Sequence, residues 1–384
     1  MHTANNSPAQ SSSLELLTAL VREDLRGRSA YGAPQVDVPV KLNTNENSYP
    51  LPVEVVEDIA QALLAAGRGL NRYPDREFSR LRNLLADYVS GQTGALVEPD
   101  QIWAGNGSNE ILVHVLQAFA GAGRTVLGFA PGYAMYPNYC RTTGSRWVTG
   151  IRDGDGFRMD TEAAAVRAAE EDPAVVILTS PNNPTGTALD LDVILAVHDA
   201  APRAIVVVDE AYFEFSRAGT VSAMTLLEGR PRLVVSRTMS KAFCLAGARV
   251  GYLGADPALV DLLRLVRMPY HLGTLTQVVA CTALERAGLM LAEVETLRGQ
   301  RDRIVSELGQ MGYSPSPSDA NFVLFGGLRD ERATWRALLD RGILVREVGL
   351  PGQLRVTAGT PSETTAFLEA MAALAATHLA WPSR

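Results

Sequence analysis

The sequence predicts an α/β fold, in which a mostly parallel sheet is covered by helices on both faces and a smaller α+β domain follows. Short apolar runs alternate with helix-like segments between about residues 51 and 278, which is the pattern of strands joined by crossover helices. Each run ends at glycine, proline, serine or an acidic residue. A long charged amphipathic segment, residues 291–312, then leads into a tail with three further strand-like runs.

The front of the chain differs from the rest in composition. Residues 1–13 are polar and lack the apolar stretch of a signal peptide, so we expect a disordered tail there. Residues 14–50 end in a proline-rich, extended stretch, which we expect to form an arm that contributes to the smaller domain.

Residues 51–278 are expected to form the large domain, whose predicted strands are QIWAG, RTVLGFA, AVVILTS, AIVVVDE, RLVVS and VGYLG. After the first strand, ILVHVLQAFAGAG is apolar nearly all round, which predicts a buried helix. Residues 279–384 are expected to form the small domain, with strands in SDANFVLFGG, GILVREVG and GQLRVTAG and a helix in ERATWRALLDRG. Thr360, Pro361 and Glu363 supply an N-cap, a proline at N1 and a glutamate at N3, which predicts where the last helix starts.

Composition argues against several classes of function. The chain has 384 residues and a net charge of −7 without a basic run, so we expect no nucleic-acid partner. No apolar run approaches the ~20 residues of a membrane span, so no membrane association is expected. Cys140, Cys244 and Cys281 are widely spaced and lack the spacing of a zinc site, so we expect no metal and a reducing, cytoplasmic location.

Lys241 lies in the stretch SRTMSKAFCLAGARVGY, directly after the predicted strand RLVVS. Ligands of such sheets bind at the carboxyl ends of the strands, which places this lysine at the rim of the binding crevice. Thr238, Ser240 and Arg249 supply hydroxyl donors and a guanidinium fork suited to a phosphate. A lysine beside such a phosphate site is placed for Schiff-base chemistry, whereas the plainer interpretation is a solvated surface lysine.

The other strand ends carry further candidate groups. Asp209 ends an apolar strand, where it could cap a helix or hold a pyridinium nitrogen protonated, and Tyr212 can reach the same pocket. Asn183 belongs to an Asn-Pro-Thr-Gly turn, and its amide could also donate to a ring oxygen. The backbone N–H groups of Ser108 and Asn109 open a helix after a strand and can face an anion.

The stretches GNGSNE, PGYAMY, SPNNPTG, VVVDEAYFEF, SRTMSKAF and LRVTAGT, in this order, resemble the fold-type I aminotransferases, which use pyridoxal 5′-phosphate (PLP). The similarity covers roughly residues 14–375. It implies an aspartate-aminotransferase-like fold with a seven-stranded sheet in the large domain. Within that family the chain looks most like the actinobacterial histidinol-phosphate aminotransferases, on the stretches YGAPQVDVPVKLNTNEN, NRYPD, GNGSNEIL and RMPYHLGTLTQ.

The resemblance implies a role for each candidate around the cofactor ring. Lys241 would form the Schiff base and move the proton between the substrate Cα and the cofactor. Asp209 would pair with the pyridinium nitrogen, Asn183 and Tyr212 would contact the phenolic oxygen, and Tyr133 would stack on the ring face.

The resemblance also implies the groups around the cofactor phosphate and the substrate. Tyr73 would reach the cofactor phosphate of the neighbouring subunit, which makes the enzyme a homodimer. Arg355 would clamp a substrate carboxylate, with Asn183 beside it. Tyr31 and Tyr270 are candidates for the substrate's phosphate end, or they pack at the interface of arm and domain. The cofactor phosphate itself would be held by Ser108, Asn109, Thr238, Ser240 and Arg249.

The expected reaction is amino transfer between a donor such as glutamate, with 2-oxoglutarate as its keto acid, and histidinol phosphate, with imidazole acetol phosphate as its ketone. NENSYP, Cys244 and Tyr136 depart from the family pattern, and Tyr136 is expected near the mouth of the substrate site. These departures leave open a paralogue of specialised metabolism that transaminates a free amino acid or 2-oxo acid with a cyclic, nitrogen-rich or aromatic side chain. A PLP-dependent decarboxylase and a non-catalytic PLP-binding regulator are further alternatives.

Overall fold

The computed structural model describes residues 8–30, 32–152 and 156–380, and the chain forms two compact units, residues 1–34 and 35–384. The first unit holds helix α1 (Pro8–Leu20) and the short 3-10 helix η1 (Glu23–Leu25). Helix α1 therefore begins inside the segment that composition predicts to be a disordered tail. Tyr31 lies outside the described residues.

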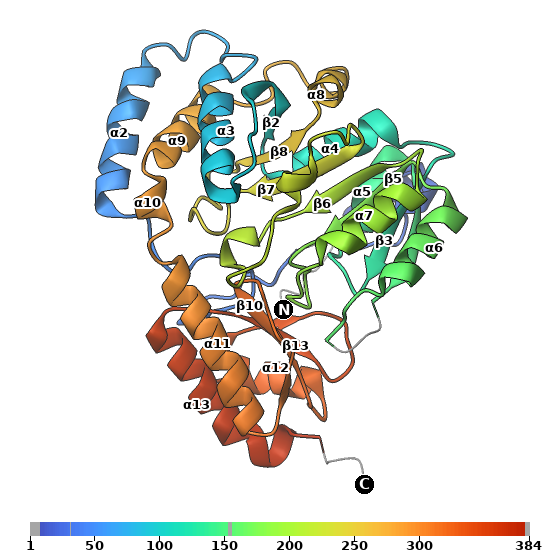
Figure 1. Cartoon of the computed structure of the whole chain (residues 1–384). Helices are drawn as coiled ribbons and strands as arrows, with labels where there is room; N and C mark the ends of the chain where they lie inside the picture. The colour runs from blue at the N-terminus through green and yellow to red at the C-terminus, as the bar shows by residue number, and fades with distance from the viewer. Residues whose placement is uncertain (1–7, 31, 153–155, 381–384) are drawn as a thin grey trace. The chain divides into compact units, whose positions relative to one another are not determined.

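A seven-stranded sheet forms the centre of the second unit, with strand order β2-β8-β7-β6-β5-β3-β4 (Figure 1). Only β8 runs antiparallel to its neighbours, so the predicted α/β fold with a mostly parallel sheet is confirmed. The strands are β2 (Ile102–Gly105), β3 (Thr125–Ala130), β4 (Arg146–Ile151), β5 (Val175–Thr179), β6 (Ile205–Asp209), β7 (Leu233–Thr238) and β8 (Gly251–Ala255).

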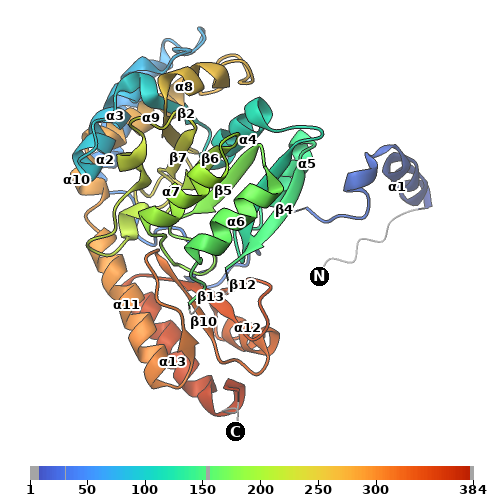
Figure 2. The same cartoon turned by 45° about the vertical axis from the view of Figure 1, so that its right-hand side comes forward.

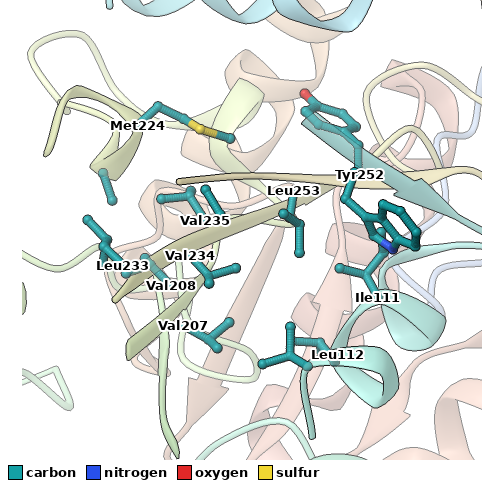
Figure 3. Packing of buried hydrophobic residues seen from close by; sticks show 14 of the residues in the cluster. Ile111, Leu112, Val207, Val208, Met224, Leu233, Val234, Val235, Tyr252 and Leu253 are labelled. Carbon is teal, nitrogen blue, oxygen red and sulfur yellow. The ribbon is translucent and has the colours of Figure 1, made fainter. Parts of the chain in front are cut away.

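The central strands are apolar because both of their faces are buried. Val207, Val208, Val234 and Val235 are fully buried, and Figure 3 shows them packed with Leu253 and with side chains of the helix that follows β2. This packing explains why β5, β6 and β7 form continuous apolar runs rather than alternating patterns. It also holds the carboxyl ends of these strands rigidly in place.

Two groups of helices pack with this sheet (Figures 1 and 2). Helix α9 packs against α2 and α3, and α6 packs against α7, while α4 contacts β2, β7 and β8. The predicted buried helix is α4, whose Ile111, Leu112, Val115 and Leu116 lie in the core. The helices are α2 (Val53–Gly67), α3 (Ser79–Thr93), α4 (Ser108–Phe119), α5 (Tyr136–Thr143), α6 (Thr161–Glu171), α7 (Leu191–Ala200), α8 (Pro257–Leu263) and α9 (Thr274–Glu285), with 3-10 helices η2 (Pro99–Gln101), η3 (Phe213–Phe215) and η4 (Ala223–Leu226).

A second, four-stranded antiparallel sheet has the order β12-β13-β10-β9. The short strand β1, from the front of the chain, pairs in parallel with β11, which precedes β12 in the sequence. Helix α11 packs on α13 and on β10, and α12 packs on α13. The predicted capping box at Thr360 and Glu363 is present at the start of α13. The elements are β1 (Val40–Lys41), α10 (Ala287–Met290), α11 (Val294–Gln310), β9 (Ser314–Pro315), β10 (Phe322–Gly326), α12 (Glu331–Leu339), β11 (Ile343–Leu344), β12 (Arg346–Glu347), β13 (Leu354–Thr357) and α13 (Pro361–His378).

The predicted boundary between large and small domains at residue 278 lies inside the second compact unit, so it stays a prediction. In the described part of the chain no single helix is long and apolar enough to cross a membrane. Residues 274–285 and 287–310 reach the required length and composition only as a pair bent by 88°.

Candidate active site

Three polar residues lie side by side at the carboxyl ends of β5, β6 and β7. In the parallel register Asp209 is opposite Thr179 on one neighbouring strand and opposite Ser236 on the other. Residues in register on adjacent strands point to the same face of the sheet. The sheet therefore brings a carboxylate and two hydroxyls together at the edge where ligands of such folds bind.

Asp209 is a buried carboxylate surrounded by hydroxyl groups. Tyr136 donates a hydrogen bond to its Oδ2 at 2.9 Å, and Ser236 donates to its Oδ1 at 3.1 Å. Burial raises the pKa of Asp209 to about 6, while the Tyr136 and Ser236 hydroxyls oppose this shift. Among the described residues, the groups that donate to this carboxylate are uncharged, so a cation placed against it would find an unneutralised negative charge.

The position of Tyr136 corrects the sequence-based expectation. Tyr136 is buried, and its hydroxyl lies 2.9 Å from both Asp209 Oδ2 and Thr179 Oγ1, rather than at the mouth of a substrate site. It occupies the first position of α5, and its ring packs edge-to-face against Tyr133. Tyr136 therefore belongs to the support of the carboxylate.

Lys241 follows β7 and is partly buried. Its Nζ donates to the backbone carbonyl of Thr44 at 3.0 Å. Burial, together with the positive charges of Arg355 and Arg249, lowers the pKa of Lys241 to about 8, against an opposing effect of Glu46. A substantial fraction of this amine is therefore neutral near pH 7 to 8, which is the form that attacks a carbonyl group.

A second polar region surrounds the N-terminus of α4. Gly107 precedes the helix with φ of 86°, and a Cβ at this position would meet Nη2 of Arg249 at 2.5 Å. The guanidinium thus packs directly on the turn before the helix. The N–H groups of Ser108 and Asn109 lie in the first turn, where no intrahelical acceptor exists. Together they form a site suited to an anion.

The remaining predicted phosphate contacts lie in the same loop as Lys241. Arg249 donates to Ser240 Oγ at 3.4 Å and to the carbonyl of Ala246 at 3.0 Å. Thr238 accepts a bond from the backbone N–H of Ser240 at 3.1 Å. The loop from Thr238 to Arg249 therefore holds its hydroxyls and its guanidinium together.

A chain of hydrogen bonds joins Arg355, Asn183 and Tyr212. Arg355 donates to Asn183 Oδ1 at 2.7 Å, and Asn183 Nδ2 donates to the Tyr212 hydroxyl at 3.4 Å. All three side chains are buried, and the Arg355 guanidinium lies 5.0 Å from the centre of the Phe322 ring. The three candidates predicted from separate motifs therefore meet in one network.

The segment Asn43–Asn45 also belongs to the site, although none of its residues was predicted to. The Asn43 carbonyl accepts a hydrogen bond from Arg355 at 2.8 Å, and the Thr44 carbonyl accepts one from Lys241. Asn45 Nδ2 donates to the Tyr212 hydroxyl at 3.0 Å. The signal that could have identified this segment is the polar run NTNEN, which carries part of the family resemblance but was given no role in the site.

Tyr73 and Tyr270 lie together at the surface. Their rings stack with centroids 4.4 Å apart and an interplanar angle of 9°. Tyr73 is 78% exposed and Tyr270 is 38% exposed. Within the described part of the chain, no hydrogen bond or ring contact joins this pair to Lys241.

The described residues fit pyridoxal 5′-phosphate. The buried Asp209 carboxylate can face a cationic ring nitrogen, the Lys241 amine can reach an aldehyde, and the turn before α4 with Arg249 can hold a phosphate. This fold and this set of groups define a PLP-dependent enzyme.

Comparison with known proteins agrees with this class. The chain belongs to the aminotransferase class I and II family, whose model matches residues 37–371, and it is a PLP-dependent aminotransferase. It is 55% identical over 367 residues to a histidinol-phosphate aminotransferase of Paenarthrobacter aurescens, covering 95% of this chain and 97% of the relative. A histidinol-phosphate aminotransferase of Thermobifida fusca is 54% identical over 351 residues, covering 91% of this chain and 94% of the relative.

A solved structure supports the fold. The histidinol-phosphate aminotransferase of Sinorhizobium meliloti, in complex with pyridoxal 5′-phosphate, superposes with a TM-score of 0.77 at 24% sequence identity. The alignment covers 98% of this chain and 99% of that one. The predicted aspartate-aminotransferase-like fold is therefore confirmed.

Proposed function

We propose that this aminotransferase exchanges an amino group between histidinol phosphate and a keto acid such as 2-oxoglutarate, with imidazole acetol phosphate and glutamate on the other side. The observation that carries the proposal is the 55% identity to the Paenarthrobacter aurescens enzyme over 95% of the chain. The site supports it with an amine, a buried acid and arginines in the arrangement that transamination requires.

Lys241 serves as the group that moves the proton. When bound, PLP supplies an electron sink for the electrons released at the substrate Cα. The Lys241 amine can take up the Cα proton because its pKa of about 8 leaves it partly neutral. The Thr44 carbonyl, 3.0 Å from Nζ, fixes the direction in which the amine points.

Asp209 would hold a negative charge against the ring nitrogen of bound PLP. Its carboxylate is buried, and the Tyr136 and Ser236 hydroxyls stabilise the ionised form. A cation against it removes the cost of burying an unpaired charge, so the ionised acid and a protonated ring nitrogen stabilise each other.

Arg355 and Arg346 supply the substrate's anion site. They are directly opposite each other on the antiparallel strands β13 and β12, so both side chains leave the same face of the sheet. A glutamate carboxylate and the phosphate of histidinol phosphate both suit guanidinium groups. Tyr270 remains a further candidate for the phosphate end.

We also propose a homodimer in the cytoplasm, with Tyr73 reaching the partner's cofactor. Tyr73 and Tyr270 belong to two loops that are joined by their ring stack and by a bond from Arg267 to the carbonyl of Arg76 at 2.9 Å. The same loops expose Leu265 and Met268, and an exposed apolar patch of this kind fits an interface. The three free thiols support a reducing compartment.

The test is a half-reaction followed through the cofactor absorbance. Histidinol phosphate and glutamate are each expected to convert the holoenzyme, whereas other free α-amino acids are not. Arg346→Gln is expected to raise the KM for histidinol phosphate about tenfold or more, since a hydrogen bond to a charged group contributes about 1.5–3 kcal/mol. Arg332→Gln removes an exposed guanidinium from the neighbouring helix α12 and serves as the control.

Two outcomes would contradict the proposal. Conversion by aromatic or cyclic amino acids but not by histidinol phosphate would identify the paralogue of specialised metabolism. Release of CO2 without formation of a keto product would identify a decarboxylase.

A further inference from the structure

Three consecutive residues of one segment each contact a different member of the site. Asn43 accepts from Arg355, Thr44 accepts from Lys241, and Asn45 donates to Tyr212. Of these contacts, only the one made by Asn45 uses a side chain, so it is the only one that depends on residue identity. Asn45 is also buried, with 1% of its surface exposed.

The position of the Asn45 side chain is fixed on all sides. Its Oδ1 accepts from the Thr357 hydroxyl at 3.1 Å, and its backbone N–H donates to the same Thr357 oxygen at 3.1 Å. Asn321 Nδ2 donates to the Asn45 carbonyl at 3.1 Å. Because Oδ1 faces Thr357, Nδ2 must face Tyr212, and it donates at 3.0 Å.

This arrangement determines whether the Tyr212 hydroxyl donates or accepts hydrogen bonds. A phenol has one O–H donor and two lone pairs. Asn45 at 3.0 Å and Asn183 at 3.4 Å both donate to the oxygen, so its lone pairs are used by two amides. These two amides orient the Tyr212 hydroxyl so that its single O–H acts as a donor.

We propose that Asn45 is a positioning residue that holds the Tyr212 hydroxyl as a hydrogen-bond donor to the phenolic oxygen of bound PLP. The inference rests on the proposed function and on the contact of Tyr212 with the phenolic oxygen that the family resemblance implies, and it adds a residue that acts through Tyr212. The bonds of Asn45 to Thr357 on β13 and to Asn321 also tie this donor to the small sheet, which carries Arg355.

The experiment titrates the visible absorbance of the holoenzyme with pH, without substrate. A donor to the phenolic oxygen stabilises its negative charge, so losing that donor raises the pH midpoint at which the Lys241-bound cofactor loses its proton. Tyr212→Phe is expected to raise the midpoint. Asn45→Gly is expected to raise it by about half to one pH unit, as for one hydrogen bond.

Glycine is the appropriate substitution because Asn45 has a φ of 56°, which glycine adopts without strain. Asn45→Asp is the second variant in case Asn45→Gly fails to fold. It keeps the acceptor for Thr357 but cannot donate to Tyr212, so it is also expected to raise the midpoint.

The double variant separates positioning from a general structural role. If Asn45 acts through Tyr212, adding Asn45→Gly to Tyr212→Phe shifts the midpoint by less than about 0.2 unit further. Asn321→Ala is the matched control, because it removes a bond to the same residue but leaves the Asn45–Tyr212 bond, and its midpoint is expected to match wild type.

Each contrary result has a distinct meaning. An unchanged midpoint in Asn45→Gly and Asn45→Asp would overturn the positioning role while leaving the proposed function intact. The same holds if Asn45→Gly shifts the midpoint equally in the wild-type enzyme and in Tyr212→Phe. A shift in Asn321→Ala as large as that in Asn45→Gly would overturn it as well. An unchanged midpoint in Tyr212→Phe would remove the role of Tyr212 itself, and the inference with it.

Discussion

The hydroxyl of Tyr136 donates to the carboxylate of Asp209 at 2.9 Å, from the first residue of α5 to the last residue of β6. Both groups are buried, and the bond opposes the effect of burial on the pKa of Asp209. A tyrosine at the start of α5 thus favours the ionised form of the acid on β6.

Tyr136→Phe is expected to weaken cofactor binding. Without this donor the pKa of Asp209 rises above its value of about 6, so less carboxylate is ionised near neutral pH. The dissociation constant for PLP should rise about tenfold, the size expected for a hydrogen bond to a charged group. The acidic limb of the kcat/KM profile should move to higher pH for the same reason.

The control is Tyr139→Phe, which removes a hydroxyl from the same helix, where the ring packs on Tyr136. Its PLP affinity and pH profile are expected to match wild type. Equal effects of the two substitutions would show that the helix, not the bond to Asp209, determines the change.

The site residues that could be predicted from the sequence are those that lie in a recognisable local pattern of neighbouring residues. Strands β5, β6 and β7 are buried on both faces, so each one is a continuous apolar run, and the polar residues at their ends stand out. Asp209 and Lys241 could be identified in this way. Strand β4 was missed because it lies at the edge of the sheet and mixes exposed polar with apolar residues.

Other features depend on contacts between distant segments. The contact of Asn45 with Tyr212 joins residues 167 positions apart, and no periodicity or turn motif encodes such a contact. Tyr136 was expected near the substrate because it departs from the family pattern in PGYAMY, but the first turn of α5 directs it toward β6. The stack of Tyr73 on Tyr270 likewise appears only once the chain is folded.

Lys241 is expected to capture PLP with a pH midpoint of about 8, rather than the 10.5 of an ordinary lysine. The neutral amine reacts, so the rate at which the apoenzyme takes up the cofactor should rise with pH and level off above this value. Arg355→Gln should move the midpoint upward, because it removes a positive charge that lowers the pKa of Lys241. Stopped-flow absorbance measures both midpoints.

The chain offers a simple control for this prediction, since it contains only two lysines, Lys41 and Lys241. Lys41→Arg should leave uptake unchanged, and borohydride reduction of the holoenzyme should place the cofactor mass on the Lys241 peptide. A midpoint near 10, or label on Lys41, would contradict the assignment.

The proposed dimer predicts a particle of twice the 41.2 kDa of one chain in sedimentation. Met268 is 72% exposed beside the Tyr73–Tyr270 stack, and Met268→Glu should raise the dissociation constant of the dimer at least about tenfold by burying a charge. Leu96→Glu, at an 81% exposed position in the loop between α3 and η2, is the control. Dissociation by both variants, or by neither, would place the interface elsewhere.

Gly107→Ala is expected to reduce PLP affinity through Arg249. Gly107 has a φ of 86°, and an added Cβ would lie 2.5 Å from Nη2 of Arg249, so the guanidinium must move away from the start of α4. The phosphate would then lose a charged partner, which predicts about a tenfold or larger rise in the dissociation constant of PLP.

Gly123→Ala separates this effect from backbone strain, because Gly123 has a φ of 78° and no atom within 4 Å of the added Cβ. Both variants should lose about 1 kcal/mol of unfolding free energy, but only Gly107→Ala should bind PLP more weakly. Equal affinities in the two variants would mean that Arg249 does not hold the phosphate from this position.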